Sequence, residues 1–580
     1  MYTILENARI VIALLKKHNI RHIVLSPGGS NIPIVQGVQD DPFFKCYSVV
    51  DERSAMYFAI GLWHETGEPI ATSCTSAQAT RNYVPGLTEA FYKHAPILAI
   101  TMSKHPRYLG QEYMQCPIQT SLPKDAVKKS FSIPRINDDN DRALCIRMTN
   151  EAILELTHHS YGPVQLNIEE LDNETWRFDD KLQLPSVRFI QRLYSKNNIE
   201  ENLSGKRILL LIGEHRVFTK EQIKAVESFS AKYNVFIYAT HIANYHGKYS
   251  LNGNPCISFI SQSIFNEQFL PDILITIGGI TGDYSIYSKL FGAPNGSFEH
   301  WRINPDGDVV DTYGKLTRVY QMSIADFFIE NEEECNNHSY FNVWKTALDN
   351  IILNTEIPLS NLFVAQQLHD KIPESSRMNF AILNSLRSWG YFSLHNSIVC
   401  SSNVAAFGID GCLSVLLGQS METEQLTFLV TGDLAFFYDM NALGIRHNKK
   451  NLRILLINNN GGMEFKFTNL VNKTNVNNFI AANDHFKNAK GWAETCGFRY
   501  LYANSKKDYY AYQDEFIRES DQPILFEIFT TPENEKLAAE LIAKPNVQNK
   551  TSDEIKDTIK KSIVNIIGLD NAKQLKKLLK

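Results

Sequence analysis

The chain has 580 residues, of which 44% are hydrophobic and 21% charged, and its net charge is −5. This length exceeds what one hydrophobic core can serve, and at roughly 150 residues per domain it predicts three or four domains. The composition is typical of a globular protein and excludes the broad basic surface that nucleic-acid binding requires.

The targeting and redox signals favour an intracellular protein. The amino-terminal segment MYTILENARIVIALLKKHNI predicts an amphipathic helix and lacks the features of a signal peptide. No apolar run reaches the roughly 18 residues that cross a bilayer. The nine cysteines are scattered without paired spacing, as in a reduced compartment. We therefore expect a cytoplasmic protein that acts on small molecules, with no nucleic-acid and no membrane partner.

The first predicted domain covers residues 1–185. Short apolar runs alternate there with helical patterns, and one helix is expected to begin at Glu52. The apolar runs are RHIVLS, KCYSVV, PIATSCT, PILAITMS and GPVQLNI. Alternation at this spacing predicts βαβ units and a doubly wound parallel sheet.

The second predicted domain covers residues 200–330 and follows a polar stretch. Its expected strands are KRILLLIGE, NVFIYAT, DILITIGG and VYQMS, which predict a smaller Rossmann-like domain. No glycine-rich fingerprint follows the first of these strands, so we do not expect a bound flavin.

The third predicted domain covers residues 355–533, with expected strands MNFAIL, SIVCSS, LTFLVTGD, LRILLINNN and PILFEIFT. Its layout resembles that of the first domain. Residues 534–580 predict a helical tail, with Ile555, Ile559, Ile563 and Ile567 at helical spacing, typical of a packing or oligomer helix. The predicted fold class is therefore α/β, with three doubly wound parallel-sheet domains and a helical carboxyl-terminal tail.

The most informative segment reads TGDLAFFYDMNALGIRHNKKNLRILLINNNGG. It runs from the end of one apolar strand through a helix to the end of the next strand, so Asp433 and Asn460 are both expected at carboxyl ends of parallel strands. A carboxylate and an amide oxygen form a hard oxygen site that suits Mg2+ and a phosphate. Gly432 is expected to allow a sharp turn, and Gly461 and Gly462 a close backbone approach. The alternative is two ordinary turns.

This pair of motifs resembles the cofactor-binding motif of the thiamine diphosphate (ThDP)-dependent decarboxylases and carboligases. The form GDLAFFYDMNAL followed by INNNGG is most similar to the menaquinone-pathway synthases of that family. The resemblance implies ThDP and Mg2+ as cofactors, a pyrimidine-binding first domain and a diphosphate-binding third domain. It also implies that Asp433, Asn460 and the Gly462 carbonyl are the metal ligands.

Two further segments carry the resemblance. SVVDERSAMYFAIGLW places Glu52 where the family has the glutamate that activates the cofactor's aminopyrimidine ring, although a surface helix cap is the ordinary alternative. SNVAAFGIDG resembles the family's SNRGASGIDG and places Ile409 between the two cofactor rings, although a core isoleucine would look the same. The remaining cofactor contacts implied are Gln78, Asn384, Ser385, Gly432, Leu434 and Phe465. The family's active sites form between subunits, which implies a homodimer or homotetramer.

The basic residues that read carboxylates in the family are missing from this chain. Other residues stand at the expected positions, namely Ser30, His105, Asp283, Tyr284, Trp389 and Val404, although Arg387 lies close by. Arginine is the usual partner of a carboxylate, so we expect an altered substrate pocket.

Several polar residues are candidates to line this pocket, and for each an ordinary surface or core role is the alternative. Gln115 and His105 are the candidates for a catalytic role beside Glu52. The substrate-lining candidates are Ser30, Asn31, Gln78, His105, Gln115, Asn384, Ser385, Arg387 and Trp389.

The sequence leaves four functions open. The first hypothesis is a carboligase that decarboxylates a 2-oxo acid and transfers the resulting acyl carbanion to a carbonyl or enone acceptor. The second is a simple 2-oxo-acid decarboxylase that releases an aldehyde. A menaquinone-pathway synthase is the third, and the missing arginines argue against it. A non-catalytic nucleotide- or phosphate-binding protein with the same folds is the fourth.

Overall fold

The computed structural model describes residues 1–170, 176–196, 200–328, 337–446, 448–466, 475–485 and 487–547. They form two compact units, the first comprising Met1–Tyr194 and Asp306–Gln321 and the second Ser195–Pro305 and the chain from Met322 onward. The isoleucines of the predicted tail lie outside the described residues, as does Cys335.

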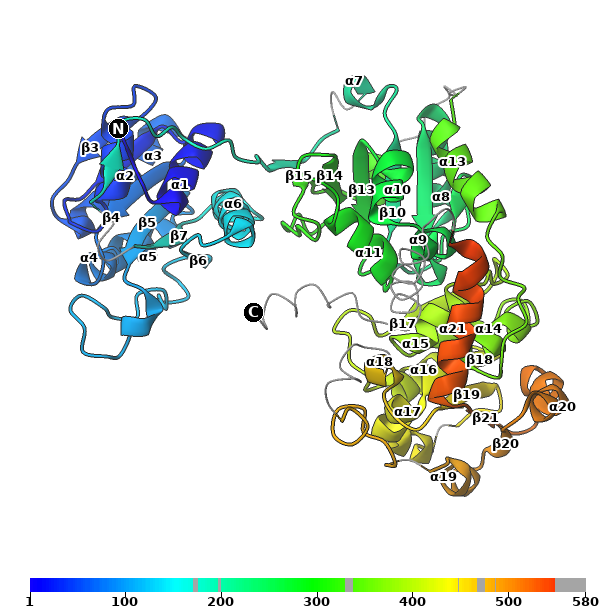
Figure 1. Cartoon of the computed structure of the whole chain (residues 1–580). Helices are drawn as coiled ribbons and strands as arrows, with labels where there is room; N and C mark the ends of the chain where they lie inside the picture. The colour runs from blue at the N-terminus through cyan, green and yellow to red at the C-terminus, as the bar shows by residue number, and fades with distance from the viewer. Residues whose placement is uncertain are drawn as a thin grey trace. The chain divides into compact units, whose positions relative to one another are not determined.

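The first unit is built on a parallel sheet, drawn in blue and cyan in Figure 1, with strand order β3-β2-β4-β5-β7-β6. Its strands are β2 (His22–Leu25), β3 (Lys45–Ser48), β4 (Ile70–Cys74), β5 (Ile97–Ser103), β6 (Ser130–Ile133) and β7 (Val164–Glu169). The helices are α1 (Glu6–Lys17), α2 (Ile32–Gln39), α3 (Glu52–Thr66), α4 (Gln78–Asn82), α5 (Val84–Tyr92), η1 (Pro106–Tyr108) and α6 (Asp139–Glu155). Two short strands, β1 (Tyr2–Thr3) and β8 (Phe178–Asp179), pair antiparallel.

The second unit contains two parallel sheets. The strands of the one nearer the amino terminus follow the order β12-β11-β10-β13-β14. They are β10 (Ile208–Ile212), β11 (Val235–Ala239), β12 (Ser250–Leu251), β13 (Ile273–Ile277) and β14 (Glu299–Ile303). The accompanying helices are α7 (Glu200–Leu203), α8 (Lys220–Lys232), η2 (His241–Ala243), α9 (Asn254–Phe259), α10 (Gln262–Ile264), η3 (Phe265–Phe269), α11 (Tyr284–Phe291), α12 (Ile324–Phe327) and α13 (Ser339–Asp349).

The other sheet of the second unit has the strand order β17-β16-β18-β19-β21-β20, all parallel. Its strands are β16 (Arg377–Phe380), β17 (Val399–Ser402), β18 (Thr427–Gly432), β19 (Leu452–Asn458), β20 (Arg499–Ala503) and β21 (Ile524–Phe529). The helices are α14 (Asn361–Leu368), α15 (Asn384–Trp389), α16 (Cys412–Ser420), α17 (Asp433–Asp439), η4 (Met440–Gly444), α18 (Met463–Lys466), α19 (Lys490–Thr495), α20 (Lys506–Ile517) and α21 (Pro532–Asn546).

The first and last sheets share one topology, because the strands occur in the same spatial order when numbered along the chain. The α/β class with parallel sheets in three regions is therefore confirmed, and so is the similar layout of the two outer regions. Their cores are dominated by Ile, Leu, Val and Ala side chains contributed by strands and helices alike. Each sheet thus presents a carboxyl edge at which loops meet, the usual ligand position in this architecture.

The sequence analysis missed several strands, among them β14 and the two strands β6 and β20, which lie at sheet edges. In both strands exposed or half-buried residues are interspersed with buried ones, so neither strand carries a continuous apolar run. Central strands of parallel sheets are buried on both faces and produce such runs, whereas edge strands do not.

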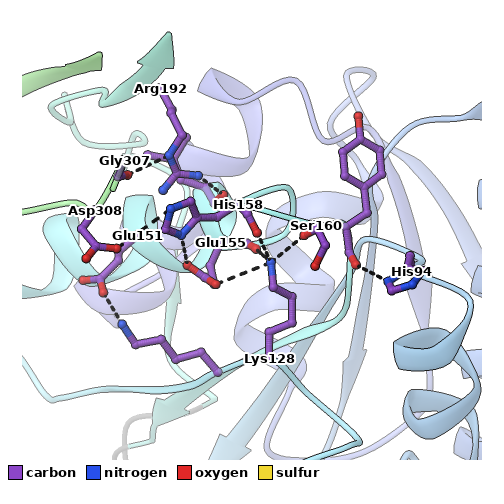
Figure 2. A network of polar contacts seen from close by, with 12 residues as sticks. His94, Lys128, Glu151, Glu155, His158, Ser160, Arg192, Gly307 and Asp308 are labelled. Atoms are coloured by element: carbon purple, nitrogen blue, oxygen red, sulfur yellow. Dashed lines mark hydrogen bonds and ion pairs between the residues drawn. The ribbon is translucent and has the colours of Figure 1, made fainter. Parts of the chain in front are cut away.

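Segment 306–321 is part of the first unit, and it contains the strand that the sequence analysis expected at VYQMS. Within it, β15 (Leu316–Tyr320) pairs parallel with β9 (Gln191–Leu193). Two polar contacts hold the start of this segment. His158 Nε2 lies 2.8 Å from the Asp306 carbonyl. The Arg192 Nε donates to the Gly307 carbonyl at 2.9 Å, a contact that is drawn in Figure 2. The strand expected at VYQMS is therefore present as β15, which begins and ends three residues earlier than expected.

Lys128 organises the same network (Figure 2). Its ammonium donates to the carbonyls of Glu155, His158 and Ser160 at 2.6–2.7 Å. These carbonyls follow the end of α6, where a helix leaves acceptors without intrahelical donors and favours a positive charge.

None of the helices in the described part of the chain combines the length and apolar character that crossing a bilayer demands.

Replacing Lys128 with methionine is expected to lower the free energy of unfolding by on the order of 3 kcal/mol, because three carbonyls lose a charged donor. Lys129→Met is the matched control, since the Lys129 side chain is 50% exposed against 13% for Lys128. Urea denaturation of both variants tests this. Equal stability of the two variants would contradict the assigned role of Lys128.

Candidate active site

Asp433 lies where two neighbouring strands end. It follows β18 as the first residue of α17, and the next strand along the sheet, β19, leads into the NNNGG loop. The carboxylate is 3% exposed. One oxygen accepts from the Gly461 N–H at 2.7 Å and the other from the Leu434 N–H at 2.8 Å. The structure therefore brings the GD and NNNGG motifs into direct contact.

The electrostatics of Asp433 favour a bound cation. Burial raises the pKa of this carboxyl group from 3.8 to about 6, against the opposing effect of the Gly461 and Leu434 N–H groups and of Lys466. A buried carboxylate is stabilised by a nearby positive charge. Within the described part of the chain, no cluster of three or more His, Cys, Asp or Glu residues suits a metal. A cation at Asp433 would therefore need amide and carbonyl oxygens as well.

The NNNGG loop has a tightly constrained backbone. Asn460 has φ +60° and Gly461 φ +116°, and a Cβ atom on Gly461 would lie 2.4 Å from the Ala481 carbonyl oxygen. Glycine is thus required there. The Asn460 amide oxygen accepts from the Asp484 N–H at 2.9 Å. The same amide donates to the Asp484 carboxylate at 3.2 Å, so the exposed Asn460 side chain is held by Asp484.

Two buried side chains, Glu527 and Asn458, hold this loop. Glu527 on β21 is fully buried and accepts from Asn458, the Ala489 N–H and the Tyr500 hydroxyl at 2.7–2.8 Å. The side chain of Asn458 in turn accepts from the Asn460 N–H at 3.3 Å. Sequence analysis missed Glu527, since it lies inside an apolar strand far along the chain.

The expectation for Gly432 needs correction. Its φ of −88° and ψ of 167° are open to any residue, so no sharp turn requires glycine. A Cβ atom there would meet no atom within 4 Å. Open space beside Asp433 is what a diphosphate would need.

Asn384 has a buried acceptor atom close to the start of a helix. It begins α15 after Leu383, which has φ +65° and ψ −127°. The Asn384 Oδ1 atom is buried and has no hydrogen-bond partner among the described residues. A buried acceptor without a donor is costly, so a ligand donor fits this position. Ser385 beside it is 4% exposed, and Ile409 is half-buried between two core clusters. These residues fit the implied cofactor.

In the first unit, Glu52 lies at the start of α3. Asp51 is the helix cap, because its carboxylate accepts from the Arg53 and Ser54 N–H groups at 2.9 and 3.3 Å. Glu52 instead accepts from the Asn82 amide at 3.0 Å and is partly exposed. The helix α3 is therefore capped by Asp51. The Glu52 carboxylate is not used as a cap.

Three other predicted residues of this unit are solvent-accessible. Gln78 is exposed at the start of α4, after Ala77 with φ +67°. Gln119, which sequence analysis missed, supports that turn by accepting from the Ala77 N–H at 2.9 Å. Gln115 is exposed with φ +58°. His105 is 44% exposed, and its Nε2 lies 3.4 Å from Glu169.

Three of the predicted substrate-lining residues are buried in the structure. Asn31 is 0% exposed and donates to the Ser26 carbonyl, which makes it part of the turn before α2. Trp389 is 0% exposed and packs in the core near Phe380. Ser30 is 6% exposed and donates to Glu170 at 3.1 Å. Neither Asn31 nor Trp389 offers an accessible surface to a substrate.

Known proteins support the cofactor assignment. A model of the thiamine pyrophosphate enzyme family, N-terminal TPP-binding domain, matches residues 6–122. The 2-succinyl-5-enolpyruvyl-6-hydroxy-3-cyclohexene-1-carboxylate synthases of Bacteroides fragilis and Phocaeicola vulgatus are each 32% identical, covering 91% and 92% of this chain and 97% of theirs. That of Flavobacterium psychrophilum is 28% identical over 91% of this chain and 97% of its own. The chain therefore belongs to the family of thiamine diphosphate-dependent enzymes.

The buried Glu535 stabilises the turn at Asn384 through Asn361. Glu535 on α21 accepts from the Asn361 N–H at 3.0 and 3.2 Å and from the Thr530 hydroxyl at 2.7 Å. The Asn361 amide donates to the Asn384 carbonyl at 3.1 Å. Burial raises the pKa of Glu535 from 4.5 to about 7, against these hydrogen bonds.

The raised pKa makes stability depend on pH. Protonated Glu535 suits the folded protein, so its contribution is complete below the unfolded value near 4.5 and is lost as pH rises through about 7. Glu535→Gln should reduce the fall in unfolding free energy between pH 5.5 and 8.5 by on the order of 2 kcal/mol. Urea titrations at both pH values measure this. The exposed Glu533→Gln is the control, and an unchanged pH profile in Glu535→Gln would refute the prediction.

Proposed function

We propose that this enzyme is a ThDP- and Mg2+-dependent carboligase that removes CO2 from a 2-oxo acid and joins the remaining acyl group to a carbonyl or enone acceptor. The bond between the 2-oxo carbon and the carboxylate breaks, a carbon–carbon bond to the acceptor forms, and one proton is taken up. No oxidant is needed. The observation that carries the proposal is the contact of Asp433 with the NNNGG loop beside open space at Gly432.

Residues of the second unit and Gln78 of the first would bind the metal ion and the cofactor. Asp433, the Asn460 side chain and the Gly462 carbonyl would hold Mg2+, which neutralises the diphosphate. Asn384 and Ser385 would donate and accept hydrogen bonds at the cofactor. The other cofactor contacts proposed are Gln78, Ile409, Gly432, Leu434 and Phe465. When bound, ThDP supplies the carbon nucleophile that attacks the 2-oxo group.

Residues of the first unit would complete the chemistry. The Glu52 carboxyl would hold a proton at a ring nitrogen of the cofactor's pyrimidine, which shifts that ring to the tautomer that removes the reacting proton. Gln115 and His105, both accessible, are the candidates to hydrogen-bond the substrate.

We further propose a homodimer or homotetramer in which Glu52 of one subunit serves the Asp433 site of another. Exposed apolar side chains flank both sites, which supports this arrangement because such patches mark interfaces. Near Glu52 these are Val50, Tyr57 and Phe58, and near Asp433 they are Val415, Phe437 and Tyr438.

Product analysis with pyruvate and with 2-oxoglutarate, each with and without added aldehyde acceptor, tests the carboligase proposal. Ligated product is expected when acceptor is present. Free aldehyde as the only product would favour a simple decarboxylase, and absence of ThDP binding would favour a non-catalytic phosphate-binding protein. Turnover of isochorismate with 2-oxoglutarate would identify a menaquinone-pathway synthase.

Glu52→Gln is expected to lower kcat at least about 100-fold, the usual scale for loss of a proton-transfer group, while ThDP affinity falls much less. The exposed Glu65→Gln on the same helix is the control. Steady-state kinetics and calorimetric ThDP titration separate the two effects. A Glu52→Gln enzyme as active as wild type would disprove the role of Glu52.

Asp433→Asn is expected to abolish the Mg2+ dependence of ThDP binding, because an amide cannot neutralise the metal's charge as a carboxylate does. ThDP titrations with and without Mg2+ measure this effect in wild type, in Asp433→Asn and in the exposed control Asp521→Asn. Retention of the Mg2+ effect in Asp433→Asn would place the metal elsewhere.

A further inference from the structure

Positions at which the family resemblance expects basic residues meet in one cluster of the second unit. The Arg387 guanidinium lies over the Tyr284 ring at 4.5 Å. The same ring meets Phe407 edge to face at 5.5 Å. A Cβ atom on Gly282 would lie 2.6 Å from Leu386 and 3.1 Å from Val404, so this turn packs against α15 and the segment after β17. We call Asp283, Tyr284, Arg387, Val404 and Glu464 the 387 cluster.

Arg387 is held by an acid within the protein. One of its terminal nitrogens donates to both Glu464 oxygens, at 3.1 and 2.8 Å. Arg387 is 5% exposed and Glu464 is 9% exposed. This ion pair compensates the charge of the Arg387 guanidinium, so a second carboxylate bound there would have no positive charge of its own to balance it. The sequence analysis identified Arg387 but missed Glu464.

The remaining members of the cluster add no positive charge. Asp283 is 5% exposed, hydrogen-bonds with the Tyr238 hydroxyl and accepts from the Ser285 N–H at 2.8 Å. Val404 is apolar and 0% exposed. The 387 cluster therefore contains two carboxyl groups and one guanidinium, and it has no cation in excess.

The cluster adjoins the segments assigned to the cofactor under the proposed function. Arg387 is three residues after Asn384, Glu464 is two after Gly462, and Phe407 is two before Ile409. The Arg387–Glu464 pair thus connects α15 to α18, the helices that follow the Asn384 turn and the NNNGG loop. The Arg387 Nε–H is buried and has no acceptor among the described residues, so the site offers a hydrogen-bond donor along with compensated charge.

We infer that the Arg387–Glu464 pair determines substrate specificity and selects 2-oxo acids whose side chain is uncharged. This inference rests on the proposed function. A donor with a second carboxylate at its far end would approach Glu464 without a free cation in the 387 cluster to pair with, and the like charges would repel each other. A neutral side chain avoids both costs. The relatives are named for a product with succinyl and carboxylate groups, so this chain would differ in substrate class while keeping the cofactor.

The test compares 2-oxoglutarate with 5-methyl-2-oxohexanoate, in which an isopropyl group replaces the distal carboxylate. CO2 release by the full-length enzyme with ThDP, Mg2+ and an aldehyde acceptor gives kcat/KM for each. Wild type is expected to favour the neutral compound at least about tenfold. Equal use of the two compounds, or preference for 2-oxoglutarate, would overturn the inference without touching the proposed function. Release of CO2 from neither compound, despite bound ThDP, would overturn both.

Glu464→Gln frees the Arg387 charge at nearly constant size. It should raise kcat/KM for 2-oxoglutarate relative to the neutral compound at least about tenfold, a change of ratio that mere loosening of the site would not produce. Glu424→Gln, whose side chain is 82% exposed, is the control and should leave the ratio unchanged. An unchanged ratio in folded Glu464→Gln protein, checked by circular dichroism, would refute the role of the pair. If this variant does not fold, the wild-type comparison still decides.

Discussion

The hydrogen bond from the Gly461 N–H to the Asp433 carboxylate is the contact on which the proposed site depends. It joins two loops that are 28 residues apart in sequence, and it forms because β18 and β19 are adjacent and parallel. Parallel neighbours end at the same edge of a sheet, so the fold itself brings both loops together. A slip of register between the two strands would separate the acid from the loop.

The shared topology of the outer sheets explains why the remaining candidates fall where they do. Glu52 follows β3, and Ile409 lies in the segment after β17, the strand of the same rank in the other sheet. Ala77 follows β4 as Asp433 follows β18. The candidate residues therefore occupy equivalent loops at the carboxyl edges of two similar sheets.

Sequence patterns predicted what depends on local chemistry or on buried strands. Most central strands were found because parallel sheets bury both faces, although β14 was missed. The edge strands β6 and β20 were missed because exposed residues interrupt their apolar pattern. The GD and NNNGG motifs were visible because glycine and short polar residues mark turns. That the two motifs lie close together was also predictable, because the two strands of a βαβ unit are parallel and end at the same edge of the sheet.

Long-range pairing could not be read from the sequence in the same way. Glu464 and Arg387 are 77 residues apart. No pattern in either segment predicts that the two side chains pair. Trp389 had been expected in the pocket, but helix α15 turns it into the core while Arg387 on the same helix meets Glu464. Which face of a six-residue helix is buried depends on its neighbours, and these come from other parts of the chain.

Two buried acids at the same sheet, Glu527 and Asp433, differ in how many protein donors they meet. Glu527 accepts three hydrogen bonds from protein donors, which replace most of the water that a carboxylate binds in solution. Asp433, equally buried, accepts only two, both from backbone N–H groups, among the described residues. Removing a carboxylate from water is tolerated when donors or a cation replace the water. Glu527 has all of these replacements within the chain, whereas Asp433 has only part of them, which supports the proposal that a metal ion is its further partner.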